Sequence, residues 1–545
     1  MERSLSGSSV YLNNAATTWP KPPCVGEAMA RFLSFGGANL GRGTSSSRDM
    51  GTLNAVLDCR IRLAALLGGY EGGDPRYVTF CPNVTEALNV VLRGLLRPGM
   101  SVLTSSLEHN AVVRPLRALE RSGVAVTFLP CGSDGALDPQ TLADALAARR
   151  YDLMVLAHAS NVCGTVQPLG RVAELCAGAG VPLVLDSAQT AGVLPIDAAA
   201  LGLAALCFTG HKGLMGPQGI GGVLWRPDFA ARVEPLVAGG TGSYSHVETQ
   251  PEELPDKFEP GTPNLPGIVG LHAALGWIGE TGIERIAGHE RELGGKLLEG
   301  LSRVEGIQLT GKRGMEGRLP VFSFNIEGLD NGILADALSR EGFETRPGLH
   351  CAPIAHRTLG SFPQGGLRVS PGYFTTSEEL DAFLEALPAA AERLDYTQSG
   401  ITRMISSLEE ELGFPLFIRS RRGVRLTENG KEMLPLFREL RRAQQRAEQS
   451  AAEIRGIVSG SLTIGCYYSI SAMWMPEILK RFKKRYPKII IRLREGGNEE
   501  MSHWLGERSV DCCLGAEPRR RDCEQPRPPH RSCSRAPSAP GSPGP

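Results

Sequence analysis

Thr209-Gly210-His211-Lys212-Gly213, followed by the glycine-rich run Gly-Pro-Gln-Gly-Ile-Gly-Gly at 216–222, is the most informative stretch of this chain. A lysine that forms a Schiff base must sit on a fixed loop whose neighbours can contact a phosphate. Thr209 and His211 supply the polar side chains for such contacts. A surface loop with a solvated lysine would have the same composition, so this stretch alone leaves both interpretations open.

The second informative stretch lies upstream, at Leu183-Val184-Leu185-Asp186-Ser187-Ala188-Gln189. Here an aspartate ends a buried apolar strand, which is where open α/β sheets place their ligands. A pyridoxal 5′-phosphate (PLP) enzyme needs an acid beside the pyridine nitrogen to keep the ring an electron sink. Asp186 fits that role and Gln189 fits a hydrogen bond to the ring hydroxyl, although a helix cap would also explain Asp186. The spacing from Asp186 to Lys212 leaves room for a strand, a helix and a return strand.

Three more polar positions follow strand-like runs. The stretch 80–89 passes from a strand into a helix, whose first N–H groups and Thr85 hydroxyl would hold a phosphate. His109 follows the next strand and is suited to stack on a flat cofactor ring, and Asn161 follows another. Taken singly, a capped helix and a structural histidine explain these positions equally well.

The first 393 residues alternate short apolar runs with longer helical stretches. This βαβ pattern predicts an α/β fold, with a mainly parallel sheet and helices on both faces. Segment 266–393 is typical of a long helix followed by a smaller α+β unit. The expected strands include 102–104, 153–156 and 183–185, and the expected helices include 139–148 and 169–179.

In this order the motifs resemble fold type I PLP enzymes, and more narrowly the class V aminotransferase and cysteine desulfurase family. The resemblance runs from Tyr11-Leu12-Asn13-Asn14-Ala15-Ala16-Thr17-Thr18 through 367–374. It implies that Lys212 binds PLP covalently and that a homodimer forms, because Thr262 matches a threonine that completes the phosphate site of the neighbouring subunit. The cofactor-binding residues implied are Val84, Thr85, His109, Asn161, Asp186, Gln189, Thr209, His211, Lys212 and Thr262.

The segment Arg346-Pro347-Gly348-Leu349-His350-Cys351-Ala352-Pro353 distinguishes members of this family. A desulfurase needs a thiolate nucleophile on a mobile loop, and Cys351 resembles that nucleophile; a small buried cysteine is the alternative. The flanking glycine, histidine and proline favour a shaped loop, in which Arg346 would help to keep the thiol ionised. Arg368 matches the family arginine that grips the substrate carboxylate. The resemblance also implies Asn161 and Arg346 as substrate-binding residues.

The resemblance therefore predicts a cysteine desulfurase that converts L-cysteine to L-alanine and leaves sulfur as a persulfide on Cys351. Lys212 would move protons with help from His109, and a protein or thiol would accept the sulfur. Selenocysteine lyase or another class V aminotransferase activity remains an alternative at this stage.

A second resemblance covers about 395–515 and concerns LysR-type transcription regulators. Residues 398–409 resemble their recognition helix and 431–457 their linker helix. The stretch 411–417, together with the arginines that follow it at 419, 421, 422 and 425, resembles their hairpin wing. The expected fold is thus a partial winged helix-turn-helix with a linker helix. The DNA-contacting residues implied are Gln398, Ser399, Thr402, Arg403, Arg421 and Arg422.

The regulator resemblance is incomplete at both ends. The two helices that precede the recognition helix are absent, and 461–515 resembles only the opening of an effector-binding domain. Either the enzyme works with a poorly folded appendage, or a PLP domain acts as the sensor of a DNA-binding regulator. PLP-dependent regulators place the DNA-binding domain first, which is the reverse of this order, so the first alternative is favoured.

Length and composition predict a chain of several domains that resides in the cytoplasm. A chain of 545 residues suggests about three domains, and its net charge of zero gives no general attraction to nucleic acid or membrane. No signal peptide or membrane span is expected, and 13 scattered cysteines without metal-ligand spacing predict reduced thiols and no metal site. The expected domains are 1–393 (a large part at about 15–265 and a small part at about 266–393 with the N-terminal segment), 395–457, 461–515 and a disordered tail at 516–545.

Overall fold

The protein is described here from a computed structural model that divides into two compact units, Met1–Thr402 and Arg403–Pro545. All six residues predicted to contact DNA, and the tail 516–545, lie outside the residues that the structure describes. No helix within the described residues is long and apolar enough to cross a membrane. The described residues are 9–36, 40, 46–244, 246–393, 405, 408–420, 423–454, 460–467, 471, 473, 475–486, 489–506 and 509–514.

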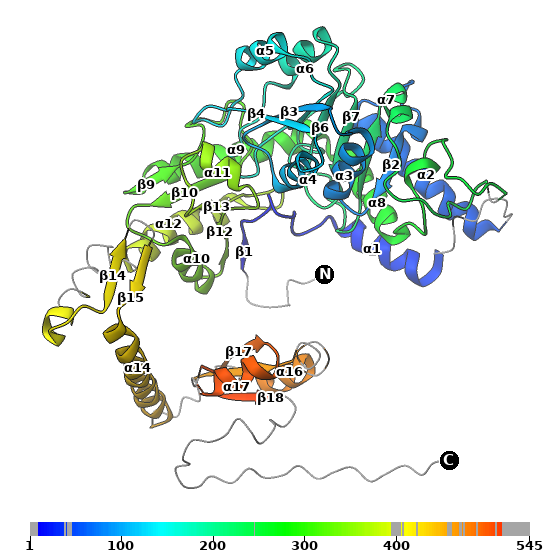
Figure 1. The fold of residues 1–545 in the computed structure, drawn as a ribbon. Coiled ribbons are helices and arrows are strands. Elements are labelled where there is room, and N and C mark those ends of the chain that lie inside the picture. The colour runs from blue at the N-terminus through cyan, green and yellow to red at the C-terminus, as the bar shows by residue number, and fades with distance from the viewer. Residues whose placement is uncertain are drawn as a thin grey trace, which may run out of the picture. The chain divides into compact units, whose positions relative to one another are not determined.

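The first unit is built on a seven-stranded sheet with the order β2-β8-β7-β6-β5-β3-β4 (Figure 1). Strand β8 is antiparallel to both of its neighbours, and the other neighbouring pairs are parallel. The predicted α/β fold with a mainly parallel sheet is therefore confirmed. The strands are β2 (Val78–Cys81), β3 (Ser101–Ser105), β4 (Ala125–Leu129), β5 (Leu153–Ala157), β6 (Leu183–Asp186), β7 (Ala205–Thr209) and β8 (Gly221–Trp225).

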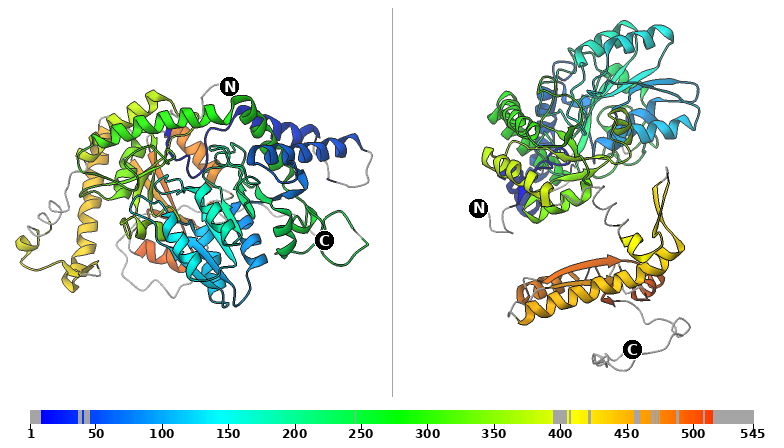
Figure 2. Two further views of the ribbon diagram at one scale, coloured as in Figure 1. Left: turned by 90° about the horizontal axis from the view of Figure 1, so that it is seen from above. Right: turned by 90° about the vertical axis from the view of Figure 1, so that its left-hand side faces the viewer.

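Helices cover both faces of this sheet, as the views in Figure 2 show. Successive strand residues point to opposite faces, so Val102 of β3 joins one hydrophobic core and Leu103 joins the other. The strands are thus packed against a hydrophobic core on each face of the sheet. This packing holds in place the strand ends that carry the polar residues. The first face packs against α3 (Val84–Leu95), α4 (Asn110–Glu120) and α7 (Pro227–Arg232), and the second against α2 (Ser47–Leu67), α5 (Pro139–Ala148), α6 (Leu169–Gly178) and α8 (Leu265–Thr281).

The connection between Asp186 and Lys212 is long enough for a helix but contains none. It runs through turns at 188–193 and 198–202 before β7 begins. A helical turn starts at Ser187, whose carbonyl accepts from Ala191 N, but Gly192 has φ 82° and ends it. A Cβ on Gly192 would lie 2.4 Å from the carbonyl oxygen of Gly213, so the glycine also lets this segment touch the Lys212 loop.

The remainder of the first unit has a second sheet with its own core. The long helix expected after 266 is two helices, because Gly282 with φ 88° separates α8 from α9 (Ile283–Ser302). The antiparallel sheet has the order β12-β13-β10-β9, and the N-terminal β1 (Val10–Tyr11) pairs with β11 (Phe343–Glu344).

The division of this unit into a large and a small domain stays a prediction. The other elements are α1 (Pro23–Arg31), β9 (Ile307–Leu309), β10 (Phe322–Ile326), α10 (Asn331–Arg340), β12 (Arg346–Gly348), α11 (Pro353–Thr358), β13 (Gly366–Val369) and α12 (Ser377–Arg393).

The second unit has a hairpin, a long helix and a small parallel sheet. The hairpin of β14 (Phe417–Ser420) and β15 (Gly423–Leu426) occupies the place of the expected wing. The α14 helix (Glu428–Ile454) covers most of the expected linker helix. The sheet has the order β17-β16-β18, and its elements are β16 (Gly460–Cys466), α16 (Met475–Arg485), β17 (Ile489–Glu495), α17 (Asn498–Gly506) and β18 (Cys512–Leu514).

Candidate active site

The predicted site residues of the large sheet lie at one edge. Because the carboxyl ends of parallel strands meet at the same edge, the segments that follow β2, β3, β5, β6 and β7 converge there. These segments carry Val84 and Thr85, then His109, Asn161, Asp186 with Gln189, and His211 with Lys212. The structure therefore gathers, from five separate connections, residues that the sequence only placed after strands.

Lys212 is the amine at the centre of this edge. Burial lowers the pKa of Lys212 to about 8, and the cations Arg368 and Arg346 lower it too, while Asp186 and Cys351 act in the opposite direction. These interactions show that residues of β6, β12 and β13 share one site with the lysine. A neutral amine, the form that can act as a nucleophile or base, is thus accessible near physiological pH.

Asp186 ends β6 as a buried carboxyl group. Its Oδ1 accepts a hydrogen bond from Ala188 N at 2.9 Å. Burial raises the pKa of Asp186, whereas the Ala188 hydrogen bond and the Lys212 cation lower it. A cation placed against this carboxylate would be stabilised, as a protonated ring nitrogen requires. Gln189 lies close by and donates from Nε2 to the carbonyl of Ala15 at 3.1 Å.

His109 caps the N-terminus of α4. Its Nδ1 accepts from Ala111 N at 3.0 Å, so Nδ1 carries no proton. Burial and the nearby Lys212 and Arg346 cations lower the pKa of His109 to about 4. The ring is therefore neutral at physiological pH, with its proton on Nε2.

The first turn of α3 and the end of β7 form a cradle for an anion. Asn83 caps α3 by accepting from Glu86 N at 3.0 Å, and the first N–H groups of a helix have no acceptor within it. Within the described residues, the buried Thr209 Oγ1 and His211 Nδ1 have no hydrogen-bond partner. A Cβ on Gly221 would lie 2.9 Å from Asn83 Cα, so this glycine lets the two segments approach. Unpaired donors beside a helix N-terminus fit a phosphate.

Cys351 lies in a short turn between β12 and α11 and is exposed. Its Sγ is 3.9 Å from a terminal nitrogen of Arg346, a donor that suits a thiolate. The carbonyl of Cys351 accepts from Asn110 N at 2.9 Å, which ties the turn to the residue after His109. The expected shaped loop is therefore a turn anchored to the neighbouring α4.

Two arginines face each other across strands beside this turn. Arg346 of β12 is the cross-strand partner of Arg368 of β13. The buried Arg368 donates to the carbonyl of Asn161 at 2.9 Å and to Oδ1 of Asn13 at 2.8 Å. Its Nε has no partner within the described residues. Such a pair of cations with a free buried donor fits a small carboxylate.

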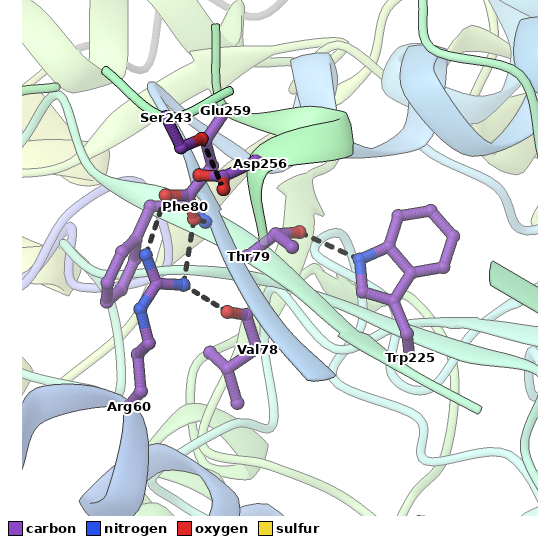
Figure 3. Close-up of polar contacts among 8 residues, drawn as sticks. All are labelled: Arg60, Val78, Thr79, Phe80, Trp225, Ser243, Asp256 and Glu259. Carbon is purple, nitrogen blue, oxygen red and sulfur yellow. Dashed lines mark hydrogen bonds and ion pairs between the residues drawn. The ribbon is translucent and has the colours of Figure 1, made fainter. Parts of the chain in front are cut away.

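Thr262 lies apart from these residues on an exposed loop, beside a cavity of about 220 Å³ that Pro82 and Glu86 also line. A buried ion pair anchors the start of this loop (Figure 3). Arg60 donates to both carboxylate oxygens of Glu259, at 2.8 and 2.6 Å, and Phe80 N also donates to that carboxylate. Removing one partner of such a pair costs several kcal/mol, so the loop is firmly held at Glu259.

Sequence reasoning missed several residues at this edge. Glu108 is buried, and its carboxylate accepts from Ser105 Oγ at 2.6 Å and from Ala157 N at 3.0 Å, which joins the ends of β3 and β5. Burial raises the pKa of Glu108 to about 8. Lys21 donates to the carbonyl of His211 at 2.7 Å. Asn13 lay inside a recognised motif, but nothing in the sequence indicated its contact with Arg368.

Comparison with known proteins settles the family. Residues 10–383 match the family model for aminotransferase class V. The chain belongs to the class V aminotransferase family. Members of this family are PLP enzymes, and the expected fold type I architecture is confirmed by the solved structures below.

The relatives of this class V aminotransferase family member include probable cysteine desulfurases. The probable cysteine desulfurase of Methanothermobacter thermautotrophicus is 33% identical to this chain, and that of Pseudomonas aeruginosa is 34% identical. Each of these two matches covers 70% of this chain and 94% of the relative. A solved apo cysteine desulfurase from Thermococcus onnurineus has a TM-score of 0.65, with 29% identity over 70% of this chain and 94% of its own. A cysteine desulfurase from Escherichia coli, in an S-sulfonic acid form, has a TM-score of 0.63, with 28% identity over 72% and 96%.

The C-terminal resemblance is confirmed as well. Residues 385–431 match the model for the bacterial regulatory helix-turn-helix protein of the LysR family, and 455–528 match the LysR substrate binding domain. The class V match ends at 383 and the helix-turn-helix match begins at 385, and both positions lie inside α12. The match to the regulator family thus begins within the last helix of the enzyme unit.

Proposed function

We propose that this chain is a PLP-dependent cysteine desulfurase that converts L-cysteine to L-alanine and keeps the sulfur as a persulfide on Cys351. The observation that carries the proposal is the exposed Cys351 thiol. Its sulfur lies 3.9 Å from the Arg346 guanidinium. The same thiol group interacts electrostatically with Lys212 and acts to raise the pKa of that lysine. A transaminase needs no thiol at this position, whereas sulfur transfer does. The relatives named above support the same choice over selenocysteine lyase or amino-group transfer.

The residues at the sheet edge fit PLP, which would supply an electron sink for the chemistry at the substrate's α-carbon. Lys212 would hold the cofactor covalently, Asp186 would pair with its ring nitrogen, and His109 would stack on the ring. Asn161 and Gln189 would serve the ring hydroxyl. The unpaired Thr209 Oγ1 and His211 Nδ1 would bind the phosphate, together with Val84 and Thr85 at the start of α3. Thr262 of the partner subunit would complete this phosphate site in a homodimer.

Arg368 and Arg346 would hold the substrate carboxylate. Arg368 is already fixed by Asn161 and Asn13, so its free Nε has a defined direction. Binding the carboxylate there would leave the sulfur end of cysteine facing the Cys351 turn. Positioning of this kind brings the reacting atoms together before the reaction begins.

The sulfur transfer is a displacement at the substrate's sulfur. The Cys351 thiolate attacks that sulfur, an S–S bond forms, and the substrate's Cβ–S bond breaks. The electron pair of the broken bond stays on Cβ, which takes up a proton and becomes the methyl group of alanine. Lys212 is the proposed proton carrier, with the neutral His109 assisting through its Nε2–H. A protein or small thiol then takes the sulfur from Cys351.

The proposal is tested by giving purified, PLP-loaded protein L-cysteine with a thiol reductant and measuring alanine and sulfide. We expect both products in equal amounts, and we expect both to be lost when PLP is removed from the protein. A protein that holds PLP but leaves cysteine unchanged would refute the desulfurase assignment. Parallel assays with L-selenocysteine, and with a keto acid as amino acceptor, would then identify which alternative applies.

Cofactor loading should depend on pH through Lys212. The attacking amine must be neutral, and its pKa is about 8, so loading should accelerate as pH rises through about 8 and level off above it. An unperturbed lysine, with a pKa of about 10.4, would still be accelerating at pH 9. Stopped-flow absorbance after mixing apoprotein with PLP between pH 6.5 and 9.5 measures this. A rate that keeps rising beyond pH 9 would contradict the prediction.

We propose that the LysR-like segment adds no sequence-selective DNA binding. The sequence before the recognition-helix resemblance is that of α12, which packs into the core of the enzyme unit, and does not resemble the two helices that support a LysR-type recognition helix. The whole chain should bind duplex DNA weakly, with dissociation constants of about 10⁻⁶ to 10⁻⁴ M at physiological salt and no preference among sequences. Gel-shift titrations test this with two sets of DNA duplexes, one of random sequence and one taken from the region upstream of the gene for this protein. Nanomolar binding to one sequence would favour the regulator alternative.

The remaining assignments are also proposals. The cysteines in the described residues are free thiols, which suits a reducing cytoplasm. The sulfur acceptor is a protein or small thiol that can reach the exposed Cys351.

A further inference from the structure

The turn that carries Cys351 has an uncommon backbone. His350 and Cys351 are consecutive non-glycine residues with φ of 49° and 58°, in the left-handed region. This region is sterically unfavourable for residues other than glycine, so the conformation persists only if the surroundings hold it. Part of the holding comes from the backbone: the His350 carbonyl accepts from Asn161 Nδ2 at 2.7 Å and the Cys351 carbonyl from Asn110 N at 2.9 Å.

The His350 side chain provides the other part. Its Nε2 lies 2.9 Å from the carbonyl oxygen of Arg346, and its Nδ1 lies 3.2 Å from Nε2 of His356. Nδ1 of His356 in turn lies 2.7 Å from Oγ of Ser361. Both imidazoles are buried. A continuous chain of hydrogen bonds therefore runs from Ser361 through two rings to the backbone of β12.

The positions of the protons in this chain follow from chemistry. A carbonyl oxygen only accepts, so His350 Nε2 must carry a proton and donate to Arg346. Burial lowers the pKa of His350 to about 3 and that of His356 to about 4, so both rings are neutral. His350 Nδ1 is then bare and accepts from His356 Nε2–H. His356 Nδ1 is bare in turn and accepts from the Ser361 hydroxyl.

This directed chain crosses the base of the Cys351 turn. His356 belongs to α11, Ser361 to the segment after it, and Arg346 to β12, whereas His350 lies inside the turn. The chain thereby fixes the turn to the two elements that flank it. It also fixes the backbone of Arg346, whose guanidinium lies 3.9 Å from the cysteine sulfur.

We propose that His350 and His356 are positioning residues, which hold Cys351 in its left-handed turn and its sulfur beside Arg346 through the chain Ser361–His356–His350–Arg346. The inference rests on the proposed role of Cys351 as the sulfur-accepting nucleophile. The hydrogen bonds of the two imidazoles run to the backbone of Arg346, to each other and to the Ser361 hydroxyl. They act through the backbone that carries the thiol.

His356→Leu in the PLP-loaded protein tests the proposal. It removes the donor to His350 while retaining an apolar side chain of similar reach. We expect kcat for sulfide release to fall by about a hundredfold, as for a displacement of about 1 Å in a reacting group, with KM for cysteine changed little. His356→Gln keeps an N–H donor and should recover much of the loss. Ser361→Ala should have a smaller effect, because it removes only the outermost bond.

Alkylation of Cys351 gives a readout that does not depend on desulfurase activity. The rate of its reaction with iodoacetamide, followed by mass spectrometry, should fall several-fold in His356→Leu, because the sulfur would lose its fixed position beside the Arg346 guanidinium. The Gln variant should alkylate close to the wild-type rate. His289→Leu is a matched control, since that partly buried histidine contacts Tyr373 and lies outside the chain of hydrogen bonds.

Each outcome decides the proposal. Wild-type kcat and alkylation rate in His356→Leu would overturn it. Equal losses in the Leu and Gln variants, accompanied by equally lowered melting temperatures, would also overturn it, because the histidine would then serve folding alone. If His356→Leu does not fold, the test passes to His356→Gln and Ser361→Ala. A lower kcat and alkylation rate in Ser361→Ala than in His356→Gln would then support the proposal, and wild-type values in Ser361→Ala would overturn it. If the wild type consumes no cysteine, the proposed function fails, while the alkylation rates still test the positioning.

Discussion

Replacing Lys212 with alanine is expected to abolish covalent cofactor binding and to lower sulfide release by at least about a thousandfold. The variant loses both the amine that would hold PLP and the proposed proton carrier, and a positioned proton-transfer group alone contributes about 10²- to 10⁴-fold. Borohydride reduction followed by mass spectrometry should find a PLP adduct on Lys212 in the wild type and none in the variant. Sulfide and alanine assays measure the lost activity.

Lys296→Ala is the control for this experiment. Lys296 is a partly exposed lysine paired with Asp381, away from the sheet edge, so its loss should leave the activity unchanged. The variant Lys212→Ala should still fold, although Asp186 loses a neighbouring cation that lowers its pKa. Activity within tenfold of wild type, or a reducible adduct on another lysine, would contradict the assignment of Lys212.

Replacing Cys351 with alanine is expected to leave cofactor binding intact and to stop sulfide and alanine formation. The thiol is the only group of the proposed mechanism that can form an S–S bond with the substrate, and removing a covalent nucleophile should cost at least about a thousandfold in kcat. The PLP absorbance band should remain, because Cys351 lies on a separate turn from the cofactor residues. Mass spectrometry of the wild type after one turnover should show one added sulfur on Cys351.

Cys512→Ala is the matched control, because Cys512 is also exposed but lies in the second unit. It should keep wild-type activity and carry no sulfur after turnover. Full activity in Cys351→Ala would show that another group accepts the sulfur. In that case the substrate proposal would survive, and the nucleophile would have to be sought elsewhere.

The sequence by itself determined the sheet and the identity of its polar residues. Asp186, His109 and Lys212 each follow a strand-like run, and apolar runs that alternate with helical stretches are typical of βαβ units, which form a mainly parallel sheet. Parallel pairing then requires the carboxyl ends of those strands to meet, so local pattern was enough to place these residues at one edge. The resemblance in motif order identified the family, and the match over residues 10–383 confirmed it.

Local pattern was insufficient where backbone conformation depends on contact with distant segments. The connection from Asp186 to Lys212 is long enough for a helix, but Gly192 ends the first helical turn where the chain packs against the Lys212 loop. The antiparallel direction of β8 likewise depends on its pairing with both β7 and β2. Periodicity gives the same signal for either strand direction, so it carried no information on this point.

Only the tertiary structure decided how the reactive groups are held. Arg368 is oriented by Asn161 and Asn13, which are far from it in the sequence, and the Cys351 turn is held by His356 and Asn161. The physical reason is that hydrogen bonds act only over about 3 Å and depend on direction. Such contacts exist only after several elements have packed together. The sequence thus specified which chemical groups reach the site, and the packing of the two sheets decided which protons, charges and backbone conformations they have there.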